Sequence, residues 1–180
     1  MRFSRSQCIG IVVDVQERVV PAVDGRDDLV AAMERLVRGL AALEVPRVLV
    51  EHNPKGLGAT IEPIRGLMEG CPRFEKLAFS CCGEPGFLEH LRGSGRTASI
   101  VAGTESHVCV LQTVLDLLAA GFAVAVVEDA VGSRRPADRG IALERMRQEG
   151  ARITTVESLL YELTERAGTD EFRRILQIVK

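Results

Sequence analysis

Short runs of apolar residues alternate along this chain with stretches in which apolar residues recur at helical spacing. The runs are typical of strands buried in a sheet, and the spacing is typical of amphipathic helices. The runs predict strands at residues 8–13, 47–50, 77–79, 98–102, 123–127 and 151–154. The spacing predicts helices at residues 27–43, 85–91, 106–120, 136–148, 157–163 and 170–179. Residues 106–120 are apolar nearly all round and should be heavily buried, whereas the Gly- and Pro-rich residues 53–72 predict an irregular excursion.

Strands that alternate with helices indicate right-handed βαβ units and a parallel sheet with helices on both faces. We therefore expect an α/β fold, and one domain over residues 1–180, because a domain typically holds about 100–200 residues. Ligands of such sheets bind beyond the carboxyl ends of the strands. The residues expected at this edge are Asp14, Glu51, those around Lys76, 103–109 and Asp129.

The composition excludes several classes of protein. With 46% hydrophobic residues the chain can bury a full core, which excludes a disordered chain. Its formal net charge of −2 gives no global field for nucleic acid or an acidic membrane, and 4% aromatic residues without Trp count against base stacking. The longest apolar run, 117–127, is shorter than the ~20 residues of a membrane span. We expect a small-molecule partner, no nucleic acid and no membrane.

The cysteines and the N-terminus indicate a cytoplasmic protein. The five cysteines are an odd number without zinc-type spacing, which predicts free thiols in a reducing compartment. The first apolar run, 8–13, ends at Asp14, too early for a signal peptide.

Two residues near the predicted strand ends stand out as candidates for chemistry. Asp14 ends a buried strand, where a desolvated carboxylate favours its neutral form or needs a cationic partner; the alternative is an acid that caps a turn. If Ser106 is the N-cap, Cys109 lies in the first helical turn, where free N–H groups and the helix dipole stabilise a thiolate or an oxyanion. The alternative is that Cys109 is one more small buried residue.

Other residues are weaker candidates when each is considered alone. A lone lysine such as Lys76 is usually a solvated surface charge, and only neighbouring chemistry would change that interpretation. Arg134 and Arg135 precede Pro136, where they could hold an anionic substrate or partner or simply begin a helix in solvent. No G-x-G-x-x-G follows any predicted strand, so dinucleotide binding is excluded.

Five segments occur together in a recognisable order. They are Asp14-Val15-Gln16, residues 53–58, 76–80, 103–113 and 129–134, and the fourth and fifth are the most specific. With them the chain resembles the isochorismatase-like cysteine hydrolase family over about residues 6–163. The resemblance implies a three-layer α/β/α sandwich with a parallel six-stranded sheet in the order 3-2-1-4-5-6. It also makes a homo-oligomer the expected assembly.

The resemblance also implies a set of site residues. The family's catalytic Asp, Lys and Cys correspond to Asp14, Lys76 and Cys109. A cis peptide bond is implied between Thr104 and Glu105, and it would turn the Glu105 N–H into an oxyanion hole shared with the Cys109 N–H. The residues expected to shape the substrate pocket are Gln16, Phe79 and His107.

The sequence departs from the family pattern in places. Thr104 stands where an aliphatic residue is usual, and Cys82 stands where an aromatic one often occurs, which suggests a roomier pocket. The histidines that hold a metal in the nicotinamidase branch have no counterpart, because Glu51-His52 is followed by Asn53. We therefore expect no metal and no cofactor, disfavour nicotinamide as a substrate, and expect His52 to be a surface or loop residue.

The function implied by the resemblance is hydrolysis of a small amide through a thioester on Cys109, with Asp14 moving the proton. Two alternatives stay open. One is cleavage of a vinyl ether of the isochorismate type, which is driven by protonation and needs no nucleophilic thiol. The other is an oligomeric binding protein in which the three residues are idle.

Overall fold

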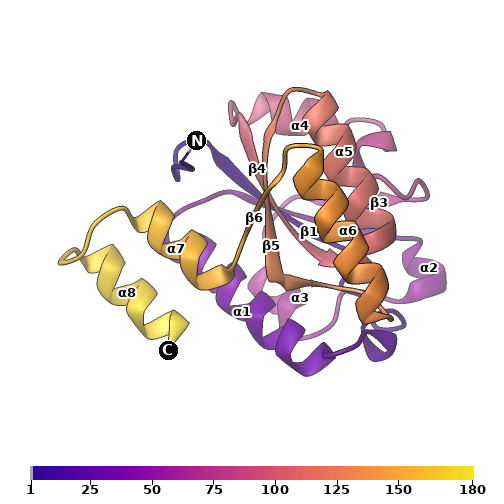
Figure 1. Ribbon diagram of the computed structural model, residues 1–180, viewed down its shortest axis with the longest axis horizontal. Coiled ribbons are helices and arrows are strands. Elements are labelled where there is room, and N and C mark those ends of the chain that lie inside the picture. Colours follow the sequence, from indigo (N-terminus) through magenta and orange to yellow (C-terminus); the bar gives the residue numbers. More distant parts are fainter. Residues whose placement is uncertain (1) are drawn as a thin grey trace.

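The computed structural model describes residues 2–180, and a parallel sheet of six strands runs through its centre (Figure 1). The strand order is β3-β2-β1-β4-β5-β6. The strands are β1 (Cys8–Val13), β2 (Arg47–His52), β3 (Arg73–Lys76), β4 (Ala98–Thr104), β5 (Ala123–Gly132) and β6 (Arg152–Thr154). The predicted α/β class and the strand order implied by the resemblance are both confirmed.

Helices cover both faces of the sheet and make three layers (Figure 1). The longer ones are α1 (Arg26–Ala42), α4 (Phe87–Gly93), α5 (Leu111–Ala119), α6 (Pro136–Gln148), α7 (Val156–Thr164) and α8 (Asp170–Val179). Single turns are η1 (Val20–Ala22), α2 (Pro54–Leu57), α3 (Ile64–Leu67), η2 (Cys81–Gly83) and the π-helical η3 (Ser106–Val110). Alternate residues of β1 divide between two cores, one under α1, α3, α7 and α8 and the other under α4, α5 and α6.

The central strand is buried on both faces, as its continuous apolar run predicts. It pairs with β2 through Gly10 to Val13 and with β4 along its whole length. At the end of this second pairing, Gly103 has φ 136°, and a Cβ there would collide with the Val13 carbonyl. The close approach of β4 to β1 at the carboxyl edge therefore requires glycine.

The predicted third strand at residues 77–79 is wrong. The strand is Arg73–Lys76, which pairs with β2 so that Glu75 lies opposite Glu51 and Lys76 lies opposite His52. Leu77 and Phe79, whose apolar character suggested a strand, are 75% and 51% exposed. An edge strand buries little of its surface, so its residues carry no long apolar run.

The predicted helix at residues 106–120 begins later than expected and ends at Ala119. Residues 106–110 form the π-helical turn η3, and the α-helix begins at Leu111. Ser106 is not the N-cap; Glu105 holds that position and makes no side-chain cap. The helix is not buried all round either, because Gln112 and Asp116 face solvent.

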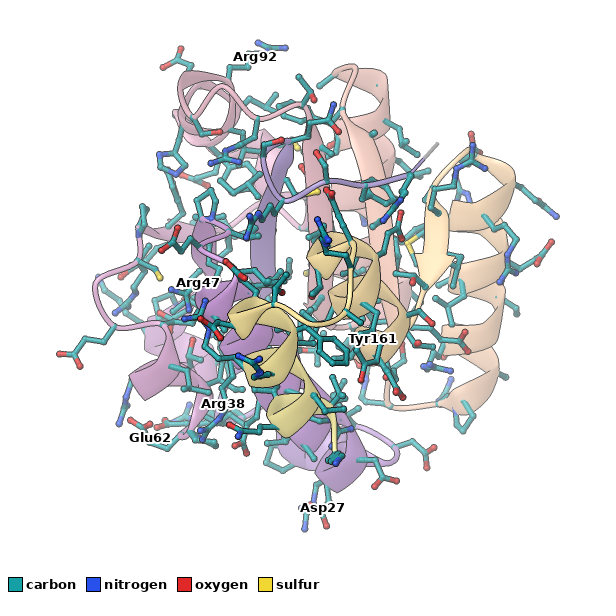
Figure 2. All side chains as sticks on the ribbon, turned by 90° about the vertical axis from the view of Figure 1, so that its left-hand side faces the viewer. Asp27, Arg38, Arg47, Glu62, Arg92 and Tyr161 are labelled. Atoms are coloured by element: carbon teal, nitrogen blue, oxygen red, sulfur yellow. The ribbon has the colours of Figure 1, made fainter. Side chains whose placement is uncertain are left out.

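The C-terminal helices pack beside α1. Tyr161 of α7 is labelled in Figure 2. Its ring lies against that of Phe172 of α8, with centroids 6.1 Å apart. Ile175, in the apolar stripe of α8, is fully buried in the same core. Within residues 2–180, every helix is too short or too polar to cross a membrane.

Candidate active site

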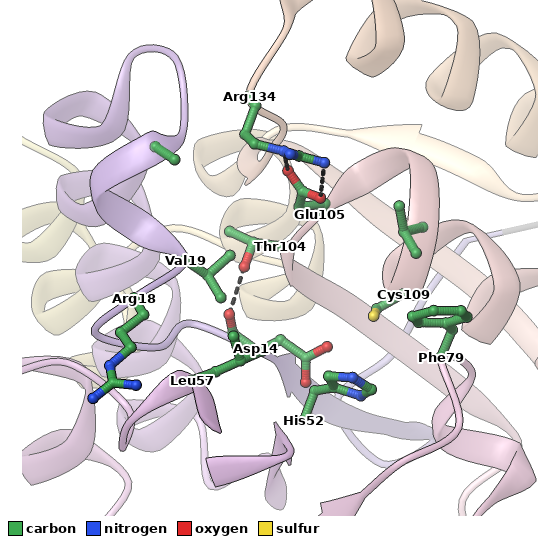
Figure 3. Close-up of a pocket in the computed structure, with 12 residues that line it drawn as sticks. Asp14, Arg18, Val19, His52, Leu57, Phe79, Thr104, Glu105, Cys109 and Arg134 are labelled. Carbon is green, nitrogen blue, oxygen red and sulfur yellow. Dashed lines mark hydrogen bonds and ion pairs between the residues drawn. The ribbon is translucent and has the colours of Figure 1, made fainter. Parts of the chain in front are cut away.

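A cavity of about 390 Å³ opens at the carboxyl ends of the central strands (Figure 3). Its floor carries Asp14, which follows β1, and Cys109, which lies in η3. The other lining residues are Arg18, Val19, Ala22, His52, Leu57, Phe79, Thr104, Glu105, Val108 and Arg134. The cavity therefore lies where ligands bind in open parallel sheets.

Asp14 forms a buried ion pair with Lys76, which is not itself a lining residue of the cavity. The Lys76 Nζ donates to Asp14 Oδ2 at 2.8 Å, and both side chains are almost fully excluded from solvent. Asp14 adopts φ 51°, a left-handed conformation that aspartate tolerates better than most residues. Asp14 Oδ1 has no conventional hydrogen-bond partner among the described residues, which leaves one carboxylate oxygen free at the cavity.

Burial controls the protonation of this pair. It raises the pKa of Asp14 above its ordinary value, against the opposing effects of the Lys76 charge and of contact with the Cys109 thiol. For Lys76, burial lowers the pKa, but the charge and hydrogen bond of Asp14 together outweigh it, and the net pKa is above the ordinary value. We assign the pair as carboxylate and ammonium.

Cys109 completes the cluster as a neutral thiol. Burial and the neighbouring Asp14 carboxylate raise the pKa of Cys109 to about 12, although Lys76 acts in the opposite direction. The expectation that the helix N-terminus keeps a thiolate here is therefore wrong for the resting site. Removal of solvent and the adjacent carboxylate outweigh the helix N-terminus, so the proton must leave the sulfur during reaction.

The segment between β4 and η3 shapes the wall beside Cys109. The peptide bond from Thr104 to Glu105 is cis. The Thr104 hydroxyl donates to the Asp14 carbonyl, which ties this segment to the end of β1. The Glu105 carboxylate accepts from Arg134 at 2.6 and 3.3 Å, so Arg134 lies at the cavity (Figure 3) instead of simply starting a helix.

Gln16, expected to contact substrate, lies behind the cavity wall. It is fully buried, and its side-chain amide donates to the His52 and Gly58 carbonyls at 3.1 and 2.7 Å. Its side-chain oxygen accepts from the His52 N–H at 2.9 Å. Gln16 therefore joins the end of β2 to the loop after it.

Of the three expected pocket residues, Phe79 alone lines the cavity. Its ring stacks on His52, with centroids 5.6 Å apart and planes 22° apart. His107 instead pairs with Ser133 through Nδ1 at 3.0 Å and is not a lining residue. The geometry thus places Phe79 at the cavity and His107 against the start of α6.

His52 and Arg18 are polar lining residues that the sequence analysis did not assign to the cavity. His52 is the last residue of β2 and is half-buried at the cavity, so its assignment as a surface or loop residue is wrong. The signal was available, because the carboxyl end of a strand next to β1 belongs to the functional edge. No pattern in the sequence marks Arg18, which reaches the cavity from the turn after β1.

Two acids expected at this edge have other partners. Glu51 is buried, accepts from the Thr60 N–H and hydroxyl at 2.7 and 2.6 Å, and pairs with Arg73 at 2.6 Å. Asp129 accepts from the Val156 N–H at the start of α7. Neither lines the cavity.

The described residues also bear on metals and disulfides. Within residues 2–180, no three His, Cys, Asp or Glu side chains gather in a metal-binding arrangement. All five cysteines are free thiols, including the adjacent Cys81 and Cys82. The reactive groups gathered here are the Cys109 thiol and the Asp14 carboxylate, and Asp14 is paired with the Lys76 ammonium group.

Residues 8–158 match the model of the isochorismatase domain. The chain belongs to the isochorismatase family. A curated relative, isochorismatase family protein 1B of Dictyostelium discoideum, is 37% identical over 174 residues, which cover 94% of this chain and 84% of that protein. The family makes this chain an isochorismatase-family hydrolase.

Solved structures of this fold carry different descriptions. One described as the MAR1 ribonuclease from Caenorhabditis elegans superimposes with a TM-score of 0.94 at 33% identity, covering 99% of this chain and 92% of that one. The YcaC gene product from Escherichia coli, described as an octameric hydrolase of unknown specificity, gives a TM-score of 0.90 at 22% identity. That match covers 99% of this chain and 87% of the other, and it shows the fold alone.

Proposed function

We propose that this isochorismatase-family hydrolase cleaves the C–N bond of a small amide through a thioester on Cys109. The observation that carries the proposal is that a thiol and a carboxylate line the same cavity, and that one oxygen of this carboxylate is held by a buried ammonium group. A nucleophile, a base within reach and a group that orients the base are the parts that covalent catalysis needs.

Acylation of the thiol follows from the protonation states. As the Cys109 sulfur attacks the amide carbon, its proton passes to the free oxygen of Asp14 and the carbonyl electron pair moves to oxygen. The Lys76 ammonium stabilises the negative charge while it is shared between sulfur and carboxylate. Collapse of the tetrahedral intermediate breaks the C–N bond, and the proton on Asp14 goes to the departing amine.

Water then cleaves the thioester. Asp14, again a carboxylate, takes a proton from the attacking water, and the second tetrahedral intermediate breaks the C–S bond and frees the carboxylic acid. The departing sulfur recovers the proton from Asp14, so the sum is amide plus water giving acid plus amine. We assign the Glu105 and Cys109 N–H groups to the oxyanion in both steps.

A second candidate function uses the same floor differently. The raised pKa of Asp14 also suits an acid that protonates a vinyl ether of the isochorismate type. In that reaction Cys109 would not become acylated. The fate of the thiol therefore separates the two functions.

The experiment is a substrate screen on matched cysteine variants. Small amides, nitriles and isochorismate are offered to the wild type, to Cys109→Ala, and to Cys81→Ala, which removes another buried thiol that lies outside the cavity. We expect amide turnover in the wild type and Cys81→Ala, none in Cys109→Ala, and an acyl adduct on Cys109 by intact-protein mass spectrometry. Amide turnover by Cys109→Ala would overturn the nucleophile assignment.

The rest of the screen separates the other functions. Isochorismate cleavage that survives Cys109→Ala would favour the vinyl ether reaction. If Cys109 reacts with iodoacetamide along an ordinary thiol titration near pH 8.5 and no compound is turned over, the idle-site interpretation is favoured. We further propose that residues 1–180 act as one hydrolase domain in a homo-oligomer, a proposal that the octameric assembly of YcaC supports only as a shared fold.

A further inference from the structure

Two consecutive residues just after β5 hold the segment that leads to Cys109. Arg134 donates from Nε and Nη2 to the Glu105 carboxylate at 2.6 and 3.3 Å (Figure 3). Ser133 Oγ and His107 Nδ1 are hydrogen-bonded at 3.0 Å. Two alternate residues before the reactive thiol are thus tied to one neighbouring strand end. We call Ser133 and Arg134 together the clamp.

The clamp is itself fixed by the fold. β5 pairs with β4 as far as Gly132, which lies opposite Thr104, so the residues that follow the two strands are neighbours. Ser133 is 1% exposed, and its carbonyl accepts from the Asp24 N–H at 3.1 Å. A Cβ at Gly132 would collide with Leu29 of α1, so this helix packs directly on the end of β5. The clamp therefore has a rigid base.

Glu105 connects the clamp to the chemistry. Its carbonyl accepts from the Val108 and Val110 N–H groups at 3.1 and 3.2 Å, and these bonds begin the turn η3 that carries Cys109. Its own N–H is one of the two assigned above to the oxyanion. Glu105 is the N-cap of η3, but its side chain makes no capping hydrogen bond to the turn. The side chain reaches Arg134 instead, so the direction of the Glu105 backbone is set from β5.

The bond between Glu105 and Arg134 has little to contribute to folding. The Arg134 side chain is 61% exposed, and water screens an ion pair in such a position. Catalysis is far more sensitive to position, because a displacement of about 1 Å can lower a rate about a hundredfold. A contact that hardly affects stability can therefore have a large effect on turnover.

We propose that Ser133 and Arg134 are positioning residues for the oxyanion. Arg134 holds the side chain of Glu105, and Ser133 holds the same segment two residues further on. Together they keep the Glu105 N–H directed at the oxygen of a carbonyl that the Cys109 sulfur attacks. This role rests on the proposed function, which assigns that N–H to the oxyanion. The clamp itself neither gives nor takes a proton.

The kinetic test separates positioning from substrate binding. Arg134→Met and Ser133→Ala should each lower kcat for the amide by about tenfold to a hundredfold and leave KM within about twofold. The loss is smaller than the 10²–10³ or so that follows removal of a donor, because the Glu105 N–H remains present. Arg134→Lys, which keeps the charge, should recover part of kcat. A rise in KM at unchanged kcat would show that the clamp contacts substrate and would overturn the proposal.

Matched variants control for lost charge and lost hydroxyl. Arg147→Met removes an exposed ion-paired arginine from α6, and Ser99→Ala removes a buried hydroxyl that has no hydrogen-bond partner within residues 2–180. Neither should change kcat. Glu105→Gln keeps the backbone N–H, and Glu105→Gln/Arg134→Met should be no slower than Arg134→Met, because the two side chains act as one unit. Additive losses would overturn the action of Arg134 through Glu105.

A reversible adduct tests the clamp without amide turnover. Propionaldehyde adds to the Cys109 thiol: the C–S bond forms, the C=O bond becomes a single bond, and the thiol proton goes to the oxygen, which then faces the Glu105 N–H. Protection of Cys109 against iodoacetamide measures the dissociation constant of this adduct. In Arg134→Met and Ser133→Ala it should rise about tenfold or more. Alkylation without aldehyde should keep its rate, because substitution by iodoacetamide forms no oxyanion.

The outcomes keep the clamp separate from amide hydrolysis. Aldehyde binding that depends on the clamp, without amide turnover by the wild type, would contradict amide hydrolysis and leave the clamp standing. Aldehyde binding that is absent from the wild type, or equal in the wild type and both clamp variants, would overturn the positioning role. An equal fall in aldehyde binding and alkylation would show a displaced thiol and would overturn it as well.

Discussion

Two buried carboxylates on neighbouring strands of this protein have opposite uses. Asp14 follows β1 and Glu51 lies near the end of β2, and both are almost fully excluded from solvent. Glu51 is engaged by the Thr60 N–H, the Thr60 hydroxyl and Arg73. Asp14 has one charged partner, Lys76, and keeps one oxygen without a conventional partner at a cavity.

The difference shows what separates a reactive carboxylate from a structural one. Burial alone does not, because both residues are buried. Glu51 fixes the loop after β2 because its partners come from that loop and from β3. Asp14 is incompletely satisfied, and an unsatisfied buried carboxylate has an elevated free energy that a proton from a nearby thiol relieves.

Neutralising Asp14 and Glu51 in turn should give the largest difference between the two carboxylates, in turnover and in stability. Asp14→Asn should lower amide turnover by about 10²–10⁴-fold, the usual contribution of a general base, while the protein stays folded. Glu51→Gln should leave turnover per folded molecule unchanged and lower the free energy of unfolding by about 1–3 kcal/mol through its weakened contacts. Steady-state kinetics and urea unfolding measure the two effects, and a Glu51→Gln variant that is stable but inactive would reverse the assignment.

Removing the cationic partners tests the same comparison through stability. Lys76→Met leaves the buried Asp14 charge without its partner and should cost about 3–5 kcal/mol of unfolding free energy. Arg73→Met should cost about 1 kcal/mol, because the Arg73 side chain is 48% exposed and its ion pair is screened.

A double variant provides the control for this prediction. Asp14→Asn/Lys76→Met carries no buried charge at either position and should recover most of the stability lost in Lys76→Met. If Lys76→Met alone unfolds at the same urea concentration as the wild type, the ion pair between Asp14 and Lys76 does not contribute to stability.

The smallest effects are two opposite dependences on pH: one of the free energy of unfolding and one of the rate at which Cys109 is alkylated. Because the folded-state pKa of Asp14 is raised above its ordinary 3.8, its contribution to stability is present at low pH and is lost as the pH rises through the folded pKa. Alkylation of Cys109 should instead speed up over the same window, because only ionised Asp14 accepts the thiol proton. The difference in unfolding free energy between wild type and Asp14→Asn isolates the first slope.

Peptide mapping after iodoacetamide treatment isolates the second slope from the other four thiols. With the pKa of Cys109 raised to about 12, its alkylation should show no inflection near pH 8.5. If the alkylation rate instead rises with an inflection near pH 8.5 and shows no rise at acidic pH, Asp14 does not control the proton of Cys109.

The sequence by itself determined the fold class and most of the elements. Its apolar runs located five of the six strands, and the helix Pro136–Gln148 has the predicted bounds, because a buried strand and an amphipathic helix leave periodic signals in the chain. Asp14, Lys76 and Cys109 were named from resemblance to the family; the structure places Asp14 and Cys109 at one cavity and pairs Lys76 with Asp14.

Tertiary structure decided what has no local signal. The edge strand β3 is defined by its pairing with β2, and its one buried residue is Lys76, so no apolar run marks it. The neutral state of the Cys109 thiol depends on solvent exclusion and on a carboxylate 95 positions earlier in the chain. Arg18 and His52 reach the cavity, and Gln16 lies behind it, because hydrogen bonds join the turn after β1 to the loop after β2.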